Sequence, residues 1–223
     1  MKPTKKRDFV TIIACIALVL ICGGAFYFKL SILEFIPLII SIAIMFLQAN
    51  VNRYAFLFGA VNSVLYAIAY LNMTLYVSAL YALLISCPLQ VITFLKWQKH
   101  TQNKTTALKS MSSKNRLLLF TAMAAGWLLL YLLFAVFGSK YLLFDNTVAV
   151  IGIVASILCA MRYTEYALLQ VLSGAISTLL YAFMLLDDPR KAVWLVYSVY
   201  AAVCSMIAFV KTTRRTSENV SKK

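Results

Sequence analysis

Acidic residues and histidine are scarce in this sequence. Only 7 of the 223 residues are Asp or Glu, and His100 is the one histidine. The sequence also lacks a His, Cys, Asp and Glu cluster at metal-ligand spacing, a G-x-x-x-x-G-K-[ST] phosphate-binding loop and a G-x-S-x-G nucleophile turn. We therefore expect no bound metal, no cofactor, no ATP hydrolysis and no enzyme active site.

The five cysteines have neither C-x-x-C spacing nor any other ligand-like pattern, and each lies inside an apolar run. They are Cys15, Cys22, Cys87, Cys159 and Cys204. We interpret them as small hydrophobic residues and expect neither a disulfide nor a metal site.

Long hydrophobic runs dominate what is present. Hydrophobic residues make up 63% of the chain and charged residues 13%, and the mean hydropathy is +0.86. A soluble domain of this size does not bury so much apolar surface, so the surrounding solvent is expected to be mostly lipid. The net charge of +14 resides in short connectors between the apolar runs. That distribution indicates membrane topology and not nucleic-acid binding.

Eight apolar runs have about the length that a helix needs to cross roughly 30 Å of hydrocarbon. They cover residues 9–28, 32–48, 54–72, 76–97, 117–137, 145–161, 165–186 and 191–210. The sequence therefore predicts an all-α polytopic membrane protein with eight transmembrane helices.

The basic residues predict the orientation of these helices. With the N-terminus inside, 17 of the 21 Lys and Arg residues face the cytoplasm, and four face outward: Lys29, Lys140, Arg190 and Lys191. Cytoplasmic connectors of membrane proteins carry such an excess of Lys and Arg. We expect a multi-pass protein of the cell (inner) membrane with both termini in the cytoplasm, which agrees with an even number of spans.

Two nine-residue stretches repeat at an offset of 115. The stretch "GAVNSVLYA" at 59–67 and the stretch "GAISTLLYA" at 174–182 agree at five positions. At the same offset, "ITFLK" at 92–96 falls on "IAFVK" at 207–211 without a gap. A match across two helices and their connector indicates an internal duplication.

The duplication predicts a 1+3+1+3 arrangement of helices. Equivalent helices are four spans apart and cross the membrane in the same direction, as in transporters whose halves are related by an axis along the membrane normal. The expected parts are an N-terminal tail and extra helix (1–31), a first three-helix repeat (32–97), a basic cytoplasmic connector and linker helix (98–142), a second, parallel three-helix repeat (143–212) and a cytoplasmic tail (213–223).

Helix-weakening residues occupy equivalent places in the two repeats, because Pro37 maps onto Gly152. Paired interruptions of this kind indicate a site near the bilayer midplane and bending during alternating access, so both residues are candidate hinges. The alternative is that Gly and Pro are simply common in membrane helices.

Polar and aromatic residues inside the spans are the candidate ligand groups. Aromatic rings stack on flat heterocycles, and amides and hydroxyls hydrogen-bond to ribose or amide groups. The candidates are Asn62, Tyr66, Gln90, Gln170, Ser177, Tyr181, Trp194 and Tyr197. The alternative is that Gly59 with Ser63, and Gly174 with Thr178, form seams of small residues for helix packing, while Asn62 hydrogen-bonds across helices.

Acidic residues are nearly absent from the spans. Glu34 and Asp145 are placed near the outward ends of their helices, where hydration can support a charge. A proton-coupled carrier usually needs titratable groups inside its spans. The composition therefore favours movement of a solute down its gradient without coupling.

Parts of the sequence resemble the PnuC-type nicotinamide riboside transporters. The segments "YAFLFGAVNSVLYAIAYLNMTLYVSAL" and "LQVITFLKW" are similar to the first repeat of that family, and "FDNTVAVIGIVASILCAMRYTEYALL" is similar to the start of the second. The resemblance covers about residues 32–212. It implies a SWEET-like fold, facilitated uptake of a vitamin-like pyridine nucleoside, and trapping of that nucleoside by a separate cytoplasmic kinase.

The chain departs from that family at the start of the seventh predicted helix. Many relatives carry an E-x-W-x-x-W-x-x-x-N pattern there; Glu165 matches, but Ala167 and Gln170 replace the tryptophans and Gly174 replaces the asparagine. Two stacking surfaces and one amide are lost, which changes the shape of the site and its hydrogen-bonding groups. The resemblance thus implies a transporter and leaves its exact substrate open.

The expected function is facilitated diffusion of nicotinamide riboside, or of a closely related vitamin or nucleoside, into the cell. Its partners would be that solute, membrane lipid, functionally a nucleoside kinase, and a second copy of the chain if it is a homo-oligomer, but not nucleic acid. One alternative is a thiamine or deoxynucleoside carrier of the same fold. The other is a non-transporting membrane scaffold or substrate-capture subunit whose basic inner surface docks a partner or anionic lipid.

Overall fold

The computed structural model describes residues 3–49, 52–99, 101–102, 105–106 and 109–220, and the side chains of 9–48, 52–96 and 109–213. All eight predicted segments are helical. The elements are α1 (Pro3–Tyr27), α2 (Ile32–Ala49), α3 (Tyr54–Asn72), α4 (Tyr76–Leu80), the π-helix η1 (Tyr81–Ser86), α5 (Cys87–Lys99), β1 (Thr101–Gln102), β2 (Thr105–Thr106), α6 (Ser113–Ala135), α7 (Leu142–Ala160), α8 (Tyr166–Asp187), the 3₁₀ helix η2 (Pro189–Lys191) and α9 (Ala192–Val220). The basic connector is described only in part, and His100 lies outside the described residues.

Seven described helices are long and apolar enough to cross a membrane, and the apolar helix Ile32–Gln48 is shorter. Among these helices α6 is the least buried, because only 6% of its apolar stretch is buried inside the protein. Its exposed side chains include Leu128, Leu129, Leu132 and Leu133. Apolar side chains exposed along a whole helix are stable only where lipid covers them. The chain is a multi-pass membrane protein.

Three helices extend beyond the apolar runs that predicted them. Helix α1 begins at Pro3 and α9 continues to Val220, although the apolar runs cover only 9–28 and 191–210. Helix α6 begins after its N-cap residue Ser112, whose side chain accepts a hydrogen bond from the N–H of Asn115. Hydropathy marks where lipid contact ends, whereas backbone hydrogen bonding continues into polar residues of good helix propensity.

The fourth predicted helix contains a π-helical turn. Pro88 lies in the first turn of α5 and cannot donate a hydrogen bond to a carbonyl in the preceding turn. The π-helix Tyr81–Ser86 lies directly before it, between α4 and α5. Wider turns of this kind are frequent at functional sites. Tyr81 and Ser86 of this turn both line a cavity that lies between the helices.

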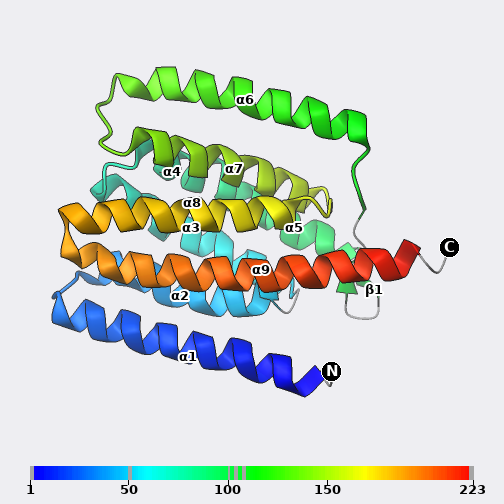
Figure 1. Cartoon of the computed structure of the whole chain (residues 1–223), viewed down its shortest axis with the longest axis horizontal. Coiled ribbons are helices and arrows are strands. Elements are labelled where there is room, and N and C mark those ends of the chain that lie inside the picture. Colours follow the sequence, from blue (N-terminus) through cyan, green and yellow to red (C-terminus); the bar gives the residue numbers. More distant parts are fainter. Residues whose placement is uncertain (1–2, 50–51, 100, 103–104, 107–108, 221–223) are drawn as a thin grey trace.

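The helices between α1 and α6 and those after α6 can be described as two groups, α2 to α5 and α7 to α9, which contact each other at two seams. Helix α3 packs against α2 and α5, and α8 packs against α7 and α9. Helix α2 packs against α9, while α7 packs against α4 and α5. Helix α1 packs on α2 and α9, and α6 packs mainly on α7, so these two helices lie at opposite edges of the bundle (Figure 1).

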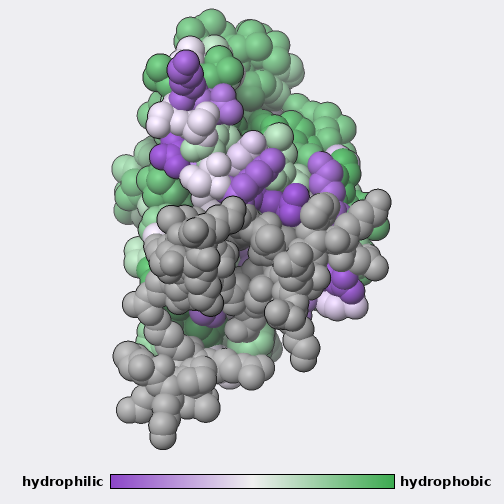
Figure 2. Space-filling view, turned by 90° about the vertical axis from the view of Figure 1, so that its right-hand side faces the viewer, coloured by the Kyte–Doolittle hydropathy of each residue, from purple (hydrophilic) through white to green (hydrophobic). Residues whose placement is uncertain are grey.

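Both chain termini lie at one end of the bundle, here called the termini end, and the opposite end is called the far end (Figure 1). Hydrophilic residues gather on the face at the termini end, while hydrophobic residues lie along much of its rim (Figure 2). Helices α1, α3 and α7 are each followed, two positions after their last residue, by a residue of positive φ, namely Lys29, Thr74 and Arg162. In each case the next N–H bonds to a carbonyl five residues earlier, which closes the helix and allows a short connector.

The segment before α6 is fixed to the turn between α7 and α8. The backbone of Lys109 exchanges hydrogen bonds with Arg162 and Thr164, each at 2.9 Å. The carboxylate of Glu165 accepts hydrogen bonds from the N–H of Met111 at 2.9 Å and from the Arg116 guanidinium at 2.8 and 3.1 Å. Partial burial by itself would raise the pKa of Glu165. The hydrogen bonds have the larger total effect, so the pKa of Glu165 is lower than its usual value.

Candidate functional site

A polar cavity of about 270 Å³ lies between the two groups of helices. Its lining comes from α2, α3, η1, α5, α7, α8 and α9. Toward the termini end the lining extends to Gln48 and Cys159, which are near the ends of α2 and α7, and to Thr93 of α5. None of the described residues that line the cavity is Asp, Glu, Lys, Arg or His. The cavity is therefore hydrogen-bonding but uncharged.

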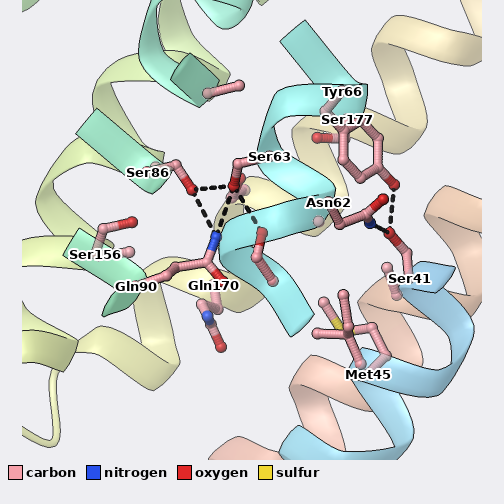
Figure 3. A pocket seen from close by; sticks show the side chains of 18 of the residues that line it. Ser41, Met45, Asn62, Ser63, Tyr66, Ser86, Gln90, Ser156, Gln170 and Ser177 are labelled. Atoms are coloured by element: carbon pink, nitrogen blue, oxygen red, sulfur yellow. Dashed lines mark hydrogen bonds between the residues drawn. The ribbon is translucent and has the colours of Figure 1, made fainter. Parts of the chain in front are cut away.

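Asn62 joins α2 and α3 beside the cavity. Its side-chain amide nitrogen donates to the backbone oxygen of Pro37 at 3.0 Å and to Ser41 Oγ at 2.8 Å. The Ser41 hydroxyl in turn donates to Tyr66 Oη at 2.8 Å (Figure 3). Asn62 is 2% exposed, and its Oδ1 atom has no hydrogen-bond partner. An unpaired buried acceptor on a cavity wall is costly unless a ligand or water supplies a donor.

Gln90 forms a second polar group on the other side of α3. Its amide nitrogen donates to Ser63 Oγ at 2.8 Å and to Ser86 Oγ at 2.9 Å (Figure 3). The side chain lies directly on Gly59, where a Cβ atom would be 1.7 Å from Gln90 Oε1. Glycine at position 59 therefore makes space for the Gln90 amide.

Tyr81 reaches from η1 across to α7. Its hydroxyl is 2.9 Å from Ser156 Oγ, and its ring lies on Gly152, where a Cβ atom would meet ring carbons at 2.9 Å. Gly152 is thus a point of close approach between the two groups of helices. The sequence predicted a hinge at this glycine; that role stays a prediction, and the observed contact gives the residue a packing reason of its own.

Five aromatic side chains, here called the aromatic cluster, lie at the far-end side of the cavity. The ring centroid of Trp194 is 5.8 Å from that of Tyr66, 6.0 Å from that of Tyr70 and 5.5 Å from that of Tyr181. The rings of Tyr66 and Tyr197 are 6.3 Å apart. The four tyrosines line the cavity, whereas Trp194 packs behind them and is 1% exposed. The four tyrosine rings thus form part of the cavity wall, and Trp194 supports them from behind.

Seven of the eight candidate ligand residues line this one cavity: Asn62, Tyr66, Gln90, Gln170, Ser177, Tyr181 and Tyr197. Trp194 supports the cavity wall through its ring contacts and is not part of the lining. Ligand binding by these residues stays a prediction. Of the two candidate hinges, Gly152 lines the cavity, and Pro37 lies inside a continuous α2, where its carbonyl accepts the bond from Asn62.

Asp145 lies in the first turn of α7, at the end of its helix as expected, but its side chain is buried instead of exposed to water. The side chain is fully buried in α7. Its two carboxylate oxygens accept hydrogen bonds from the backbone N–H groups of Val77 and Ser78 at 3.1 and 3.0 Å. These are free N–H groups of the first turn of α4, so the carboxylate caps that helix and interacts favourably with its dipole. Asp145 therefore holds α4 on α7.

The positions that depart from the family pattern have different surroundings. Gln170 and Gly174 line the cavity, whereas Ala167 does not and is buried against a hydrophobic cluster that contains Phe56 and Leu169. A Cβ atom at Gly174 would be 3.0 Å from the Cα of Ala202, so this glycine lets α8 approach α9 closely. The packing interpretation is confirmed for Gly174.

Several cavity residues were missed by sequence reasoning, chiefly Ser41, Tyr70, Tyr81, Ser86 and Ser156. A signal for two of them was present, because Ser41 and Ser156 are 115 residues apart, the offset that also relates Tyr66 to Tyr181. Tyr70 follows Tyr66 by one helical turn. Tyr81 and Ser86 depend on the π-helical turn, which the apolar pattern does not reveal.

The five cysteines are free. Among the described residues, no group of three or more His, Cys, Asp or Glu side chains could hold a metal ion. The chemistry that the cavity offers is hydrogen bonding and aromatic contact.

Apolar helices that enclose an uncharged polar cavity, lined on one side by aromatic rings, are typical of a membrane transporter. A family model described as nicotinamide mononucleotide transporter matches residues 31–214. The chain therefore belongs to the nicotinamide mononucleotide transporter family, and it is a transporter and not an enzyme.

The fold is similar to a solved structure described as the crystal structure of the vitamin B3 transporter PnuC. The TM-score is 0.79 and the sequence identity is 21%, over 92% of this chain and 91% of that chain. At this identity the likeness shows the fold alone. No curated protein sequence matches the chain significantly.

Proposed function

We propose that the protein mediates facilitated diffusion of nicotinamide riboside, or of a closely related vitamin or nucleoside, and that a separate cytoplasmic kinase traps the solute. The observation that supports this most directly is the uncharged, tyrosine-rich lining of the cavity. Membership of a transporter family supports the class of activity.

The lining favours the riboside over its phosphate ester. A phosphate group carries about −1.5 to −2 charges near neutral pH, and no described lining residue is a cation. Burying an unpaired charge of this kind costs several kcal/mol. The pyridinium ring of the riboside is instead a flat cation, which the faces of Tyr66, Tyr81 and Tyr181 can stabilise.

The unpaired Oδ1 atom of Asn62 gives the solute a specific contact. A carboxamide N–H or a ribose hydroxyl can donate to this buried acceptor. Gln170 and Ser177 line the same cavity from α8 (Figure 3). We propose that these groups bind the amide and sugar parts of one ligand between the two groups of helices.

The transport cycle that we propose uses two duplicated halves. Helices α2 to α5 would form the first parallel repeat and α7 to α9 the second, with α6 as the linker and α1 as an extra helix, in a SWEET-like arrangement. Matching bonds at the 115-residue offset support this, since Ser63 Oγ donates to the Gly59 carbonyl and Thr178 Oγ1 to the Gly174 carbonyl, both at 2.9 Å. The halves would rock about the ligand, aided by Pro37 and Gly152.

The excess of Lys and Arg at the termini end supports placing that end in the cytoplasm. The described conformation would then face inward, with the aromatic cluster closed toward the outside. The lack of charged groups in the cavity lining supports uncoupled transport, so accumulation requires a kinase.

Uptake into proteoliposomes tests the proposal. Labelled nicotinamide riboside should enter until its concentrations inside and outside are equal, and should exceed that level only with an enclosed nucleoside kinase and ATP. The mononucleotide should compete about 100-fold more weakly, which corresponds to roughly 2.7 kcal/mol. Uptake of thiamine or a deoxynucleoside in place of the riboside would favour the alternative carriers. No flux of any of these solutes would contradict the proposed substrate class.

A further inference from the structure

A second depression, of about 350 Å³, lies at the far end of the bundle, away from the central cavity. It is formed where α7 begins and α8 ends, and residues Lys140 and Tyr141 come from the connector just before α7. Its remaining lining residues are Leu143, Phe144, Phe183, Leu186 and Asp187. A site at the ends of membrane-spanning helices lies at the depth of lipid headgroups.

An ion pair forms the polar side of this depression. Lys140 Nζ is 2.7 Å from Asp187 Oδ1, and the hydroxyl of Tyr141 donates to Asp187 Oδ2. The side chains of Lys140 and Asp187 are 62% and 43% exposed. A Lys ammonium has three N–H donors and a carboxylate has about four acceptor positions, so one cation and one anion still present unused hydrogen-bonding capacity on the surface.

Apolar side chains form the other side. The rings of Phe144 and Phe183 are 5.2 Å apart, and Leu143, Phe183 and Leu186 are exposed. These residues continue the apolar outer surface of α7 and α8 up to the ion pair. Tyr141 lies at the boundary between the two sides, as tyrosines do at membrane interfaces.

We propose that this depression binds the headgroup of a phosphatidylethanolamine lipid. The lipid phosphate would bind Lys140, its ammonium would bind Asp187, and its glycerol and upper acyl chains would lie on Phe183, Leu143 and Leu186. Lys140 with Asp187, and the lipid ammonium with the lipid phosphate, each carry one positive and one negative charge. Each charge would therefore lie beside opposite charges, and the complex would add no net charge at the interface.

The charges of the depression distinguish this headgroup from other common ones. Phosphatidylcholine has no N–H donor for the Asp187 carboxylate, and phosphatidylglycerol has no cation for it. The pKa of Lys140 is raised by its hydrogen bond to Asp187, so the ammonium stays charged at neutral pH. A carboxylate beside a bound phosphatidylglycerol would repel it, whereas an ammonium headgroup relieves that repulsion.

Retention of lipids by the purified full chain tests the proposal. The protein would be equilibrated with vesicles of equal parts phosphatidylethanolamine, phosphatidylcholine and phosphatidylglycerol, and bound lipids counted by native mass spectrometry. We expect wild-type protein to prefer phosphatidylethanolamine about 3- to 5-fold, the range for an exposed charge pair. Asp187→Asn should remove the preference over phosphatidylcholine, and Lys140→Gln should weaken binding of all three lipids.

Controls separate the site from general effects of charge. Arg190→Gln changes another exposed cation of the far end, which pairs with Asp188 at 3.0 Å, and should leave lipid retention unchanged. Lys140→Arg and Asp187→Glu keep the charges and should restore most of the preference, which also covers the case in which a neutral variant does not fold. Equal retention of the three lipids by wild-type protein, or an unchanged preference in Asp187→Asn, would overturn the proposal.

One further outcome would identify a different occupant. A pyridinium cation such as N-methylnicotinamide would compete with the Lys140 ammonium for Asp187. If Lys140→Gln strengthens binding of that cation and leaves the lipid ratio unchanged, the depression is a solute site and not a lipid site.

Discussion

The stretches 59–67 of α3 and 174–182 of α8 have nearly the same sequence but different surroundings. In both stretches a hydroxyl donates to the carbonyl of the glycine with which the stretch begins: Ser63 to Gly59 and Thr178 to Gly174, each at 2.9 Å. In α3 the glycine makes space for a polar side chain, Gln90, whereas in α8 the glycine packs on the backbone of Ala202. The shared residues thus serve the helix itself, and the neighbours decide what each glycine does.

The third residue after each glycine differs most between the two stretches. Asn62 donates to Pro37 and Ser41 and keeps one acceptor unpaired. Ser177 lines the same cavity, and its hydroxyl has no hydrogen bond to another residue that the structure describes. The first stretch therefore ties its helix to α2, while the second leaves a free hydroxyl. A ligand bound between the two stretches would therefore contact different groups on its two sides.

The largest expected effect comes from truncating this pair. Asn62→Ala removes two hydrogen bonds that join α2 and α3 and should lower the free energy of unfolding by about 2 to 3 kcal/mol. It should also reduce solute uptake at least about tenfold, because the unpaired acceptor is lost. Ser177→Ala is the matched control and should change stability little. Thermal unfolding and proteoliposome uptake measure both; equal effects of the two variants would contradict the asymmetry.

Adding a methyl group at each glycine should separate the site from packing. Gly59→Ala must displace the flexible Gln90 side chain. It should reduce the uptake rate clearly and lower the free energy of unfolding less than Gly174→Ala does. Gly174→Ala brings a Cβ atom 3.0 Å from the Cα of Ala202 and should lower the free energy of unfolding by about 1 to 2 kcal/mol through overpacking. Denaturation of the purified variants, compared with their uptake rates, distinguishes the two. A larger stability loss for Gly59→Ala would reverse the comparison.

A smaller difference is expected between two serines that are also 115 residues apart. Ser41 accepts from Asn62 and donates to Tyr66, whereas Ser156 shares one hydrogen bond with Tyr81. Ser41→Ala should therefore cost about 1 kcal/mol of stability and Ser156→Ala about half as much. Differential scanning calorimetry in the same detergent checks the order, and Ser→Cys at both positions controls for side-chain volume.

The smallest effect concerns the contact of Glu165 with the segment before α6. Its pKa is lower in the folded protein than in the unfolded chain, so the contact stabilises the fold above the ordinary Glu pKa of about 4.3. This stabilisation is lost as the pH falls through the folded-state pKa. Glu165→Gln should reduce stability slightly at neutral pH, with no difference from wild type at a pH below both values. A constant difference at all pH values would exclude titration of Glu165 as the cause.

Much of the fold could be predicted because lipid imposes simple rules. A helix is the one structure that satisfies its own backbone hydrogen bonds in a single span, so apolar runs of sufficient length identify the helices. The residues beyond the runs could not be assigned in this way, since α9 continues to Val220 through polar sequence. The π-helical turn was also missed, because one proline does not specify how the preceding turn rearranges.

The candidate site was predicted in its membership but not in its contacts. Polar residues are costly in lipid, so an amide such as Asn62 inside a span is recognisable as a site candidate. The same reasoning did not reveal the contacts of Asp145, because its partners are backbone N–H groups of α4, 67 and 68 residues away along the chain. Backbone partners leave no residue type in the sequence that would reveal them.

The sequence by itself determined which segments are helical, the family and the uncharged polar character of the interior, because hydropathy and residue type act locally. Only the tertiary structure decided which side chains face the cavity and which support it. Trp194 is a ligand candidate by type, yet the rings of three tyrosines pack against it and it does not line the cavity. Such roles depend on the distances between helices, which no single segment of sequence contains.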